Sequence, residues 1–178
     1  MKTINNNEIT KEDLQNINYD FQPKLTSKLD LIVTDFDQEI INQIVLWKVN
    51  RYSEIDEYTL SLLNTIKKED EYINIETTKK VLEKLLLTKG IKLAMASTIL
   101  RFKNPKIYQI IDQRVFRFIN GKNLPNYFSS VETQIVLYLE YLENLKNVCN
   151  EKKIDFELSD RIIYELDKKF NKNEKIKY

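Results

Sequence analysis

Residues 89–118, KGIKLAMASTILRFKNPKIYQIIDQRVFRF, combine residue types whose spacing suits chemistry on a polyanion. Gly90 lies at the end of one predicted helix, and a second helix is predicted to start directly after it. Exposed amides at such a helix start can hold a phosphate group without regard to sequence. Asp112 follows a short apolar stretch, at the predicted start of the next helix. A carboxylate there can stabilise a cationic transition state and activate a water molecule.

The composition restricts what else could act as a catalyst. The chain has no histidine and one cysteine, Cys149. This excludes histidine-based acid–base chemistry and an ordinary zinc or iron–sulfur site, so we expect no metal and no cofactor. It also excludes an internal disulfide framework and favours a reducing compartment. Any catalytic group must be a carboxylate, a lysine, a tyrosine or a hydroxyl.

Charge is distributed unevenly along the chain, although the formal net charge is only +1. Residues 79–122 hold eleven Lys and Arg against two acidic residues, a net of +9. Residues 1–78 hold eight against fifteen (−7), and residues 123–178 hold nine against ten (−1). A local block of positive charge is expected of a surface that binds a polyanion. The alternative interpretation is a solvated helix face that has no partner.

The chain is expected to be helical throughout. Two glycines and three prolines among 178 residues are too few for a turn-rich β fold. We predict an all-α fold of about eight helices in one compact unit, with residues 1–20 a polar arm and residues 21–178 a single domain. The spacing of apolar residues and capping signals predicts helices over residues 37–48, 55–66, 77–88, 91–102, 112–119, 129–150 and 159–170.

Several residues mark the predicted helix ends. Asp112 has the chemistry of an N-cap, and Gly121 suits the end of the same helix. Residues 129–132, SSVE, read as a capping box. Ser159 or Asp160 is expected to cap the last helix.

Membrane contact is not expected. No apolar run approaches the roughly 20 residues that a membrane span needs, and the polar N-terminus does not resemble a signal peptide. We therefore expect a cytoplasmic protein, associated with the nucleoid if it binds DNA.

Taken together, residues 89–118 resemble the helix–hairpin–helix superfamily of DNA glycosylases, in particular its endonuclease-III-like and 8-oxoguanine-glycosylase-like members. Gly90 and Ile91 match the glycine–valine pair of the superfamily's hairpin, and Ala96 matches an alanine common on the following helix. The separation of 22 residues between Gly90 and Asp112 is the spacing expected of endonuclease-III-like members.

The resemblance continues into the aspartate motif and then departs from it. The run IDQRVFR, residues 111–117, aligns its aspartate and its last arginine with that motif, although Arg114 replaces a frequent histidine. Lys89 stands where the hairpin usually has proline, and Lys92 where it has a second glycine. Ala94 occupies the position of the catalytic lysine of bifunctional members, which argues against strand-cleaving lyase activity.

The resemblance implies a function and a set of residues. It implies a monofunctional DNA N-glycosylase that acts as a monomer on double-stranded DNA, excises a damaged or modified base and needs no cofactor. Asp112 would stabilise the oxocarbenium-like transition state and activate water; its simpler role is that of a helix cap. The residues expected to contact DNA are Lys89, Gly90, Ile91, Lys92, Leu93, Arg101, Lys103, Arg114 and Arg117.

Further residues have two interpretations each. Trp47, Phe102 and Tyr108 could stack on an extruded base, although a core role is favoured for each. The resemblance also implies a cleft between two helical layers, with the hairpin and Asp112 at its mouth. Tyr164 and Asp167 could face this cleft, with a structural role favoured. Two other functions stay open: a non-catalytic helix–hairpin–helix module that binds DNA, and a helical protein-interaction domain. The sequence does not specify the excised base.

Overall fold

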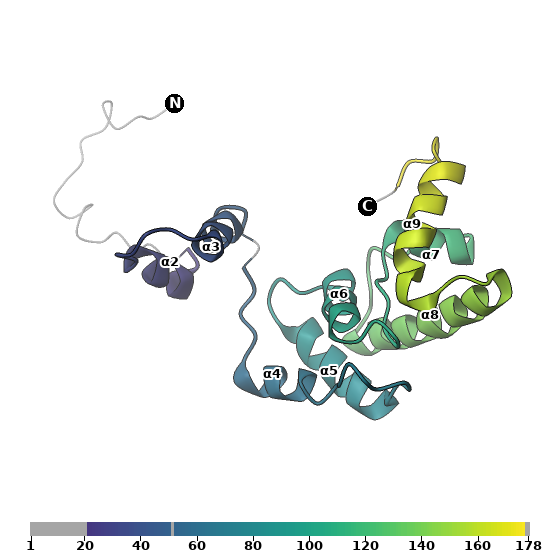
Figure 1. Ribbon diagram of the computed structural model, residues 1–178, viewed down its shortest axis with the longest axis horizontal. Helices are drawn as coiled ribbons and strands as arrows, with labels where there is room; N and C mark the ends of the chain where they lie inside the picture. The colour runs from purple at the N-terminus through teal and green to yellow at the C-terminus, as the bar shows by residue number, and fades with distance from the viewer. Residues whose placement is uncertain (1–20, 51, 177–178) are drawn as a thin grey trace. The chain divides into compact units, whose positions relative to one another are not determined.

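The structure is a computed structural model that describes residues 21–50 and 52–176 (Figure 1). Within these residues the chain forms eight α-helices, one short 3₁₀-helix and no β-strand, which confirms the predicted all-α class. The predicted arm, residues 1–20, lies outside the described residues. No helix in the described ranges is long and apolar enough to span a membrane.

The chain separates into two compact units, residues 1–52 and 53–178. The single domain expected over residues 21–178 stays a prediction.

The described part of the first unit is a pair of helices, α2 (Pro23–Asp30) and α3 (Gln38–Lys48). The sequence pattern does not predict α2, because its eight residues contain only two leucines besides the proline that starts it. Asp37 caps α3 as its position predicts, accepting the Ile40 amide at 2.8 Å. Leu25 is the one buried residue of these two helices, so the pair encloses almost no core.

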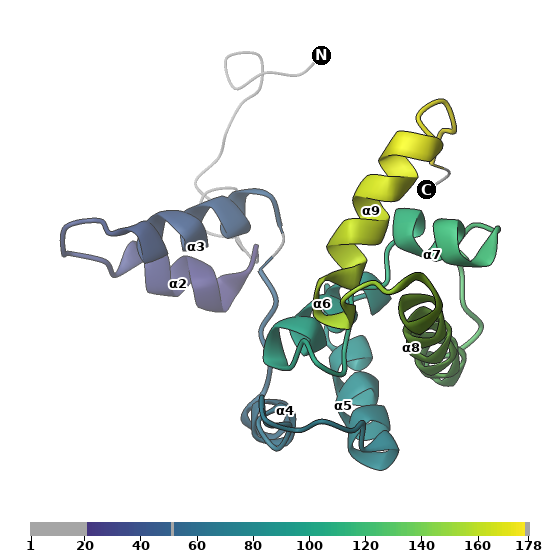
Figure 2. The same cartoon turned by 45° about the vertical axis from the view of Figure 1, so that its right-hand side comes forward.

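The second unit contains the remaining helices (Figure 2). The ends of α9 match the predicted ones, and those of the other predicted helices differ by one to three residues. The helices are α4 (Glu57–Leu63), α5 (Ile75–Leu87), α6 (Leu93–Lys103), α7 (Gln113–Asn120), α8 (Val131–Lys152), the 3₁₀-helix η2 (Phe156–Leu158) and α9 (Ser159–Phe170).

The core of the second unit forms where α5 and α6 pack together and α8 packs on α5 and α7. Val81, Leu82 and Leu85 form an apolar stripe along α5 and are fully buried. Burial of these side chains supplies the main driving force for packing, at about 25 cal/mol for each Å² of apolar surface. The stripe holds α5 in place, and α5 leads into the turn before α6.

Two predicted helix caps are wrong by one or two residues. The capping box of α8 uses Ser130 and Thr133 rather than residues 129 and 132, because the Thr133 hydroxyl accepts the Ser130 amide at 3.2 Å. Neither Ser159 nor Asp160 caps α9: both already lie inside the helix, because the turn η2 precedes it and is itself capped by Asp155.

Candidate functional site

The turn between α5 and α6 has the geometry expected of a hairpin glycine. The Ile91 amide donates to the Thr88 carbonyl oxygen at 3.1 Å, and Gly90 has a φ of +87°. A Cβ atom at Gly90 would lie 2.8 Å from Ser53 Oγ. The conformation and the close approach both favour glycine over other residues.

The start of α6 is open to solvent where Lys89 and Lys92 lie. Its N-cap residue, Lys92, supplies no side-chain acceptor for the first helical amides. Lys89 and Lys92 are exposed, and neither forms an ion pair within the described residues. The side chains of Ile91 and Leu93 are each only 4% exposed, so neither side chain is available to a ligand. The Ile91 amide already donates to Thr88, which leaves the first amides of α6, from Leu93 on, to bind an anion.

The connector, residues 104–112, leads from α6 to Asp112. It begins at the buried Asn104, which caps the C-terminus of α6, as the following proline predicts. The Asn104 side-chain amide donates to the carbonyl oxygens of Lys67 and Asp70 at 2.7 and 2.9 Å. One buried amide therefore ties the connector to the loop between α4 and α5.

Side chains from two helices bind the rest of the connector. The hydroxyls of Tyr138 and Tyr141 on α8 donate to the carbonyl oxygens of residues 109 and 110 at 3.0 and 2.6 Å. The Ile111 amide donates to Ser97 Oγ on α6 at 3.2 Å. A buried segment without regular structure needs such partners, since unpaired buried backbone groups are costly. Asp112 is consequently held at a fixed place next to α6.

Asp112 caps α7, as its position predicts. Its Oδ1 accepts the Val115 amide at 2.8 Å. Burial raises the pKa of the Asp112 carboxyl; the amides of Val115 and Arg114 and the Arg114 charge oppose this rise, while the nearby Asp160 charge adds to it. The carboxylate is therefore partly desolvated, which strengthens its interaction with a positive charge.

Asp112 also lines a pocket of about 250 Å³. The other lining residues come from the connector and from α9: they are Ile110, Asp160, Arg161, Tyr164 and Glu165. The sequence interpretation considers Tyr164 for this cleft, and the structure brings it there. Asp160 also lines this pocket, whereas the sequence suggests it only as a cap of the last helix. The signal that could have found it is spacing, because Asp160 lies four and seven residues before Tyr164 and Asp167, on one face of a helix.

The arginines of the aspartate motif contact α9. Asp167, which is fully buried, accepts hydrogen bonds from Arg117 Nη2 at 2.7 Å, Arg117 Nε at 2.8 Å and Arg114 Nη1 at 3.1 Å. Asn171 Nδ2 is a further donor at 2.7 Å. Burial alone would raise the pKa of Asp167, but the hydrogen bonds from Arg117, Asn171 and Arg114 lower it below its usual value. These bonds lock α7 onto α9 and use donors that were expected to contact DNA.

Two more expected DNA contacts also have partners inside the protein. The almost fully buried Arg101 donates to the Glu157 carbonyl oxygen at 3.0 Å, and its Nε lies 3.6 Å from the Asp160 carboxylate. Lys103 Nζ donates to Asn64 Oδ1 at 2.7 Å. Part of the basic block therefore holds the protein together, and Lys89 and Lys92 provide its unpaired charges at the hairpin.

None of the three residues considered for base stacking lines the pocket of Asp112. Tyr108 is 1% exposed, and its hydroxyl lies 2.6 Å from Thr78 Oγ1, so its ring belongs to the core and cannot stack on a base. Phe102 is exposed on α6, with the Arg101 guanidinium 5.3 Å from its ring centre. Trp47 belongs to the first unit, where its ring packs edge-on against Phe21.

Within the described residues, no group of three or more acidic or cysteine side chains is placed to hold a metal ion. No family model, no curated protein and no solved structure matches the chain. The resemblance to the glycosylase superfamily rests on residues 89–118 alone.

Proposed function

We propose that this protein is a monofunctional DNA N-glycosylase of the helix–hairpin–helix type, which excises a damaged or modified base from double-stranded DNA. One observation carries the proposal: Asp112 lines a pocket at the end of a connector that α6 and α8 hold in place. One of its carboxylate oxygens, Oδ1, accepts a hydrogen bond from the Val115 amide.

The open start of α6 suits the first step, the binding of the DNA backbone. The first amides of α6, beginning at Leu93, would bind one phosphate group, and the exposed Lys89 and Lys92 would bind its neighbours. This contact does not depend on base sequence. It suits an enzyme that must hold the duplex while a base leaves the stack, a change that costs a few kcal/mol.

Asp112 suits the second step, the cleavage of the N-glycosidic bond. As that bond breaks, the electron pair leaves with the base and positive charge develops on the sugar. The partly desolvated carboxylate would stabilise this charge and accept a proton from the water that attacks the sugar carbon. Ala94 cannot form a Schiff base, so the product would be an abasic site in an intact strand.

A second candidate function is that of a non-catalytic module that binds DNA. It is favoured by the internal ion pairs of Arg114 and Arg117 with Asp167, since these donors stabilise the fold rather than a bound substrate. Asp112 would then be a helix cap alone, worth about 1 kcal/mol.

The deciding experiment measures base release from a panel of duplexes, each with a different damaged or modified base. Wild type and Asp112→Asn are compared, and alkali then reveals abasic sites. Asparagine caps a helix as well as aspartate does, so the variant keeps the start of α7 and loses only the charge. We expect release by wild type and a loss of release in the variant.

Binding of the same duplexes separates the two candidates. No release from any duplex, with salt-sensitive binding intact in both proteins, would favour the non-catalytic module. Strand breaks before alkali treatment would contradict the monofunctional assignment. Absence of salt-sensitive binding in both proteins would favour the helical protein-interaction domain over both DNA functions.

A further inference from the structure

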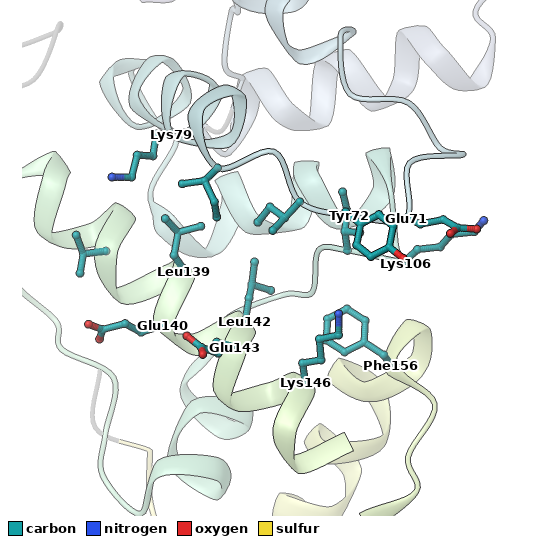
Figure 3. A pocket seen from close by; sticks show the side chains of 14 residues that line it. Glu71, Tyr72, Lys79, Lys106, Leu139, Glu140, Leu142, Glu143, Lys146 and Phe156 are labelled. Carbon is teal, nitrogen blue, oxygen red and sulfur yellow. The ribbon is translucent and has the colours of Figure 1, made fainter. Parts of the chain in front are cut away.

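A second pocket lies on another part of the second unit, with a volume of about 510 Å³ (Figure 3). It shares no lining residue with the pocket of Asp112. Five segments surround it: the stretch before α5, α5 itself, the connector, α8 and η2. The apolar side chains that line it are Tyr72, Ile73, Ile75, Ile107, Val136, Leu139, Leu142 and Phe156.

The apolar side chains form the floor and walls. Leu139 and Leu142 extend from α8 toward the centre of the pocket, with Tyr72 and Phe156 at one side (Figure 3). Leu142 is only 6% exposed and belongs to the core beneath. By contrast, Tyr72 is 81% and Val136 41% exposed. A concave site lined mainly by apolar side chains is typical of a pocket that binds a small molecule.

Charged residues lie at the edge of the pocket and balance one another. They are three lysines and three glutamates: Lys79, Lys106, Lys146, Glu71, Glu140 and Glu143. None of the six forms an ion pair within the described residues. The edge therefore has no net charge, unlike the hairpin with Lys89 and Lys92.

Size and charge together define the occupant. A volume of about 510 Å³ falls in the range of pockets for small molecules, roughly 300–1,000 Å³. Walls from five segments suit a compact molecule, whereas a partner helix needs a groove with open ends. The floor offers no charged or buried polar partner, so an ionised group would lose its hydration there without compensation. A polyanion such as DNA is excluded on the same ground.

We propose that this pocket binds a neutral, mainly apolar small molecule. The site shares no lining residue with the pocket of Asp112, and the proposal does not rest on the glycosylase proposal. Ile107 in its wall belongs to the same connector as Asp112, so both sites rest on one fixed segment.

The probe for the test is N-phenyl-1-naphthylamine, a neutral apolar dye whose fluorescence rises in apolar surroundings. It is titrated into the full chain, beside the anionic dye 8-anilinonaphthalene-1-sulfonate. We expect saturable binding of the neutral dye at one site per chain, and weaker binding of the anionic dye. Leu139→Lys places a charge on the floor and should weaken the affinity for the neutral dye at least about tenfold.

Two further variants keep the test decisive. Val136→Trp fills the mouth at a position that is 41% exposed, so it should lower dye affinity even if Leu139→Lys fails to fold. Leu60→Lys is the matched control, because Leu60 is 42% exposed on α4 and does not line the pocket; its dye binding should equal that of wild type. Circular dichroism of each variant reports folding.

Three outcomes would overturn the proposal. The first is dye binding that does not saturate at one site. The second is wild-type affinity in a folded Leu139→Lys and in Val136→Trp. The third is self-association in sedimentation experiments that excludes the dye and disappears in the Leu139 variant, which would assign the pocket to a second copy of this chain.

Discussion

The two turns at the ends of the proposed site are built in opposite ways. At the Gly90 turn the first amides of α6 lack a side-chain cap, and Lys89 and Lys92 lack ion-pair partners in the described ranges. At the start of α7, Asp112 caps the helix, and the two arginines of the motif are bonded to a buried carboxylate. The Gly90 turn leaves the first amides of α6 and two lysines available for a ligand. At the start of α7 the corresponding polar groups are bonded within the protein.

The difference shows that a positive charge in a sequence motif has two uses. Arg114 and Arg117 add to the basic block as much as Lys89 and Lys92 do, yet Asp167 neutralises one of the two arginine charges and holds both in place. Only charges without internal partners can release counterions from DNA. The four predictions below test this contrast.

The largest expected effect is on stability, at Asp167. Asp167→Ala leaves two guanidinium groups without their buried acceptor and should lower the free energy of unfolding by about 3 kcal/mol. Because the pKa of Asp167 is lowered in the folded state, its contribution is complete above the unfolded-state pKa and is lost as pH falls through the folded-state pKa. The loss in the variant should therefore shrink in acid.

Urea denaturation at several pH values measures this effect. Glu165→Ala on the same helix is the control, because its ion pair with Lys168 is exposed and should be worth about 0.5 kcal/mol or less. Equal losses in the two variants would show that the arginines do not depend on Asp167.

The next effect is on DNA binding at the hairpin. Lys89→Glu combined with Lys92→Glu reverses both unpaired charges and should weaken binding about hundredfold or more at low salt. The matched control is Lys67→Glu with Lys68→Glu, which makes the same change of charge in the loop before α5, about 20 Å away along that helix. Fluorescence anisotropy with a labelled duplex measures both. Unchanged binding in the hairpin variant would refute the hairpin as the DNA-binding surface.

A smaller effect on stability is expected at two glycines with positive φ: Gly90, in the turn after α5, and Gly121, the C-cap of α7. Gly90→Ala meets both a positive φ and Ser53 Oγ, and should cost about 1–2 kcal/mol of stability. Gly121→Ala meets a positive φ alone, with no atom within 4 Å, and should cost about 1 kcal/mol. Thermal unfolding compares them. Adding Ser53→Ala to the Gly90 variant should reduce its loss of stability to that of Gly121→Ala. A difference that persists would show that the extra loss does not come from the contact with Ser53 Oγ.

The smallest effect separates the two roles of Asp112. Asp112→Ala removes the cap and should cost about 1 kcal/mol, whereas Asp112→Asn keeps the cap and should be at least as stable as wild type at neutral pH. The carboxyl has a raised pKa in the folded state, so ionisation disfavours folding above that pKa, and the penalty disappears as pH falls below it. Any advantage of the asparagine variant should vanish in acid. A clear destabilisation by asparagine at neutral pH would show that the charge itself supports the fold.

Local signals in the sequence predict local structure well here. The cap at Asp112 and the glycine at the end of α7 occur where they are predicted, and α3 follows Asp37, the first residue of the helix predicted over residues 37–48. Each of these signals depends on a few neighbouring residues, so it can be read from the sequence without knowledge of the tertiary structure. The helix α2 is missed because two leucines in eight residues make no periodic pattern.

Pairings between distant residues could not be predicted in this way. Arg117 and Asp167 are fifty residues apart, and Tyr108 meets Thr78 across thirty. Nothing near Tyr108 in the sequence indicates whether its ring lies in the core or in a base pocket. The glycosylase interpretation of the motif stays a prediction for the same reason, since the motif specifies residue types and not their partners.

The connector has a consequence for exchange with heavy water. Amide protons in loops usually exchange within moments, because local opening of a loop needs little energy. The amides of Tyr108 and Ile111 are instead bonded to the Asn104 carbonyl oxygen and to Ser97 Oγ. The carbonyl oxygens between them accept hydrogen bonds from the two tyrosine hydroxyls of α8. The two amide protons should persist about as long as those of α5 and α8, so that the carboxylate beside them loses its position only when the core itself opens.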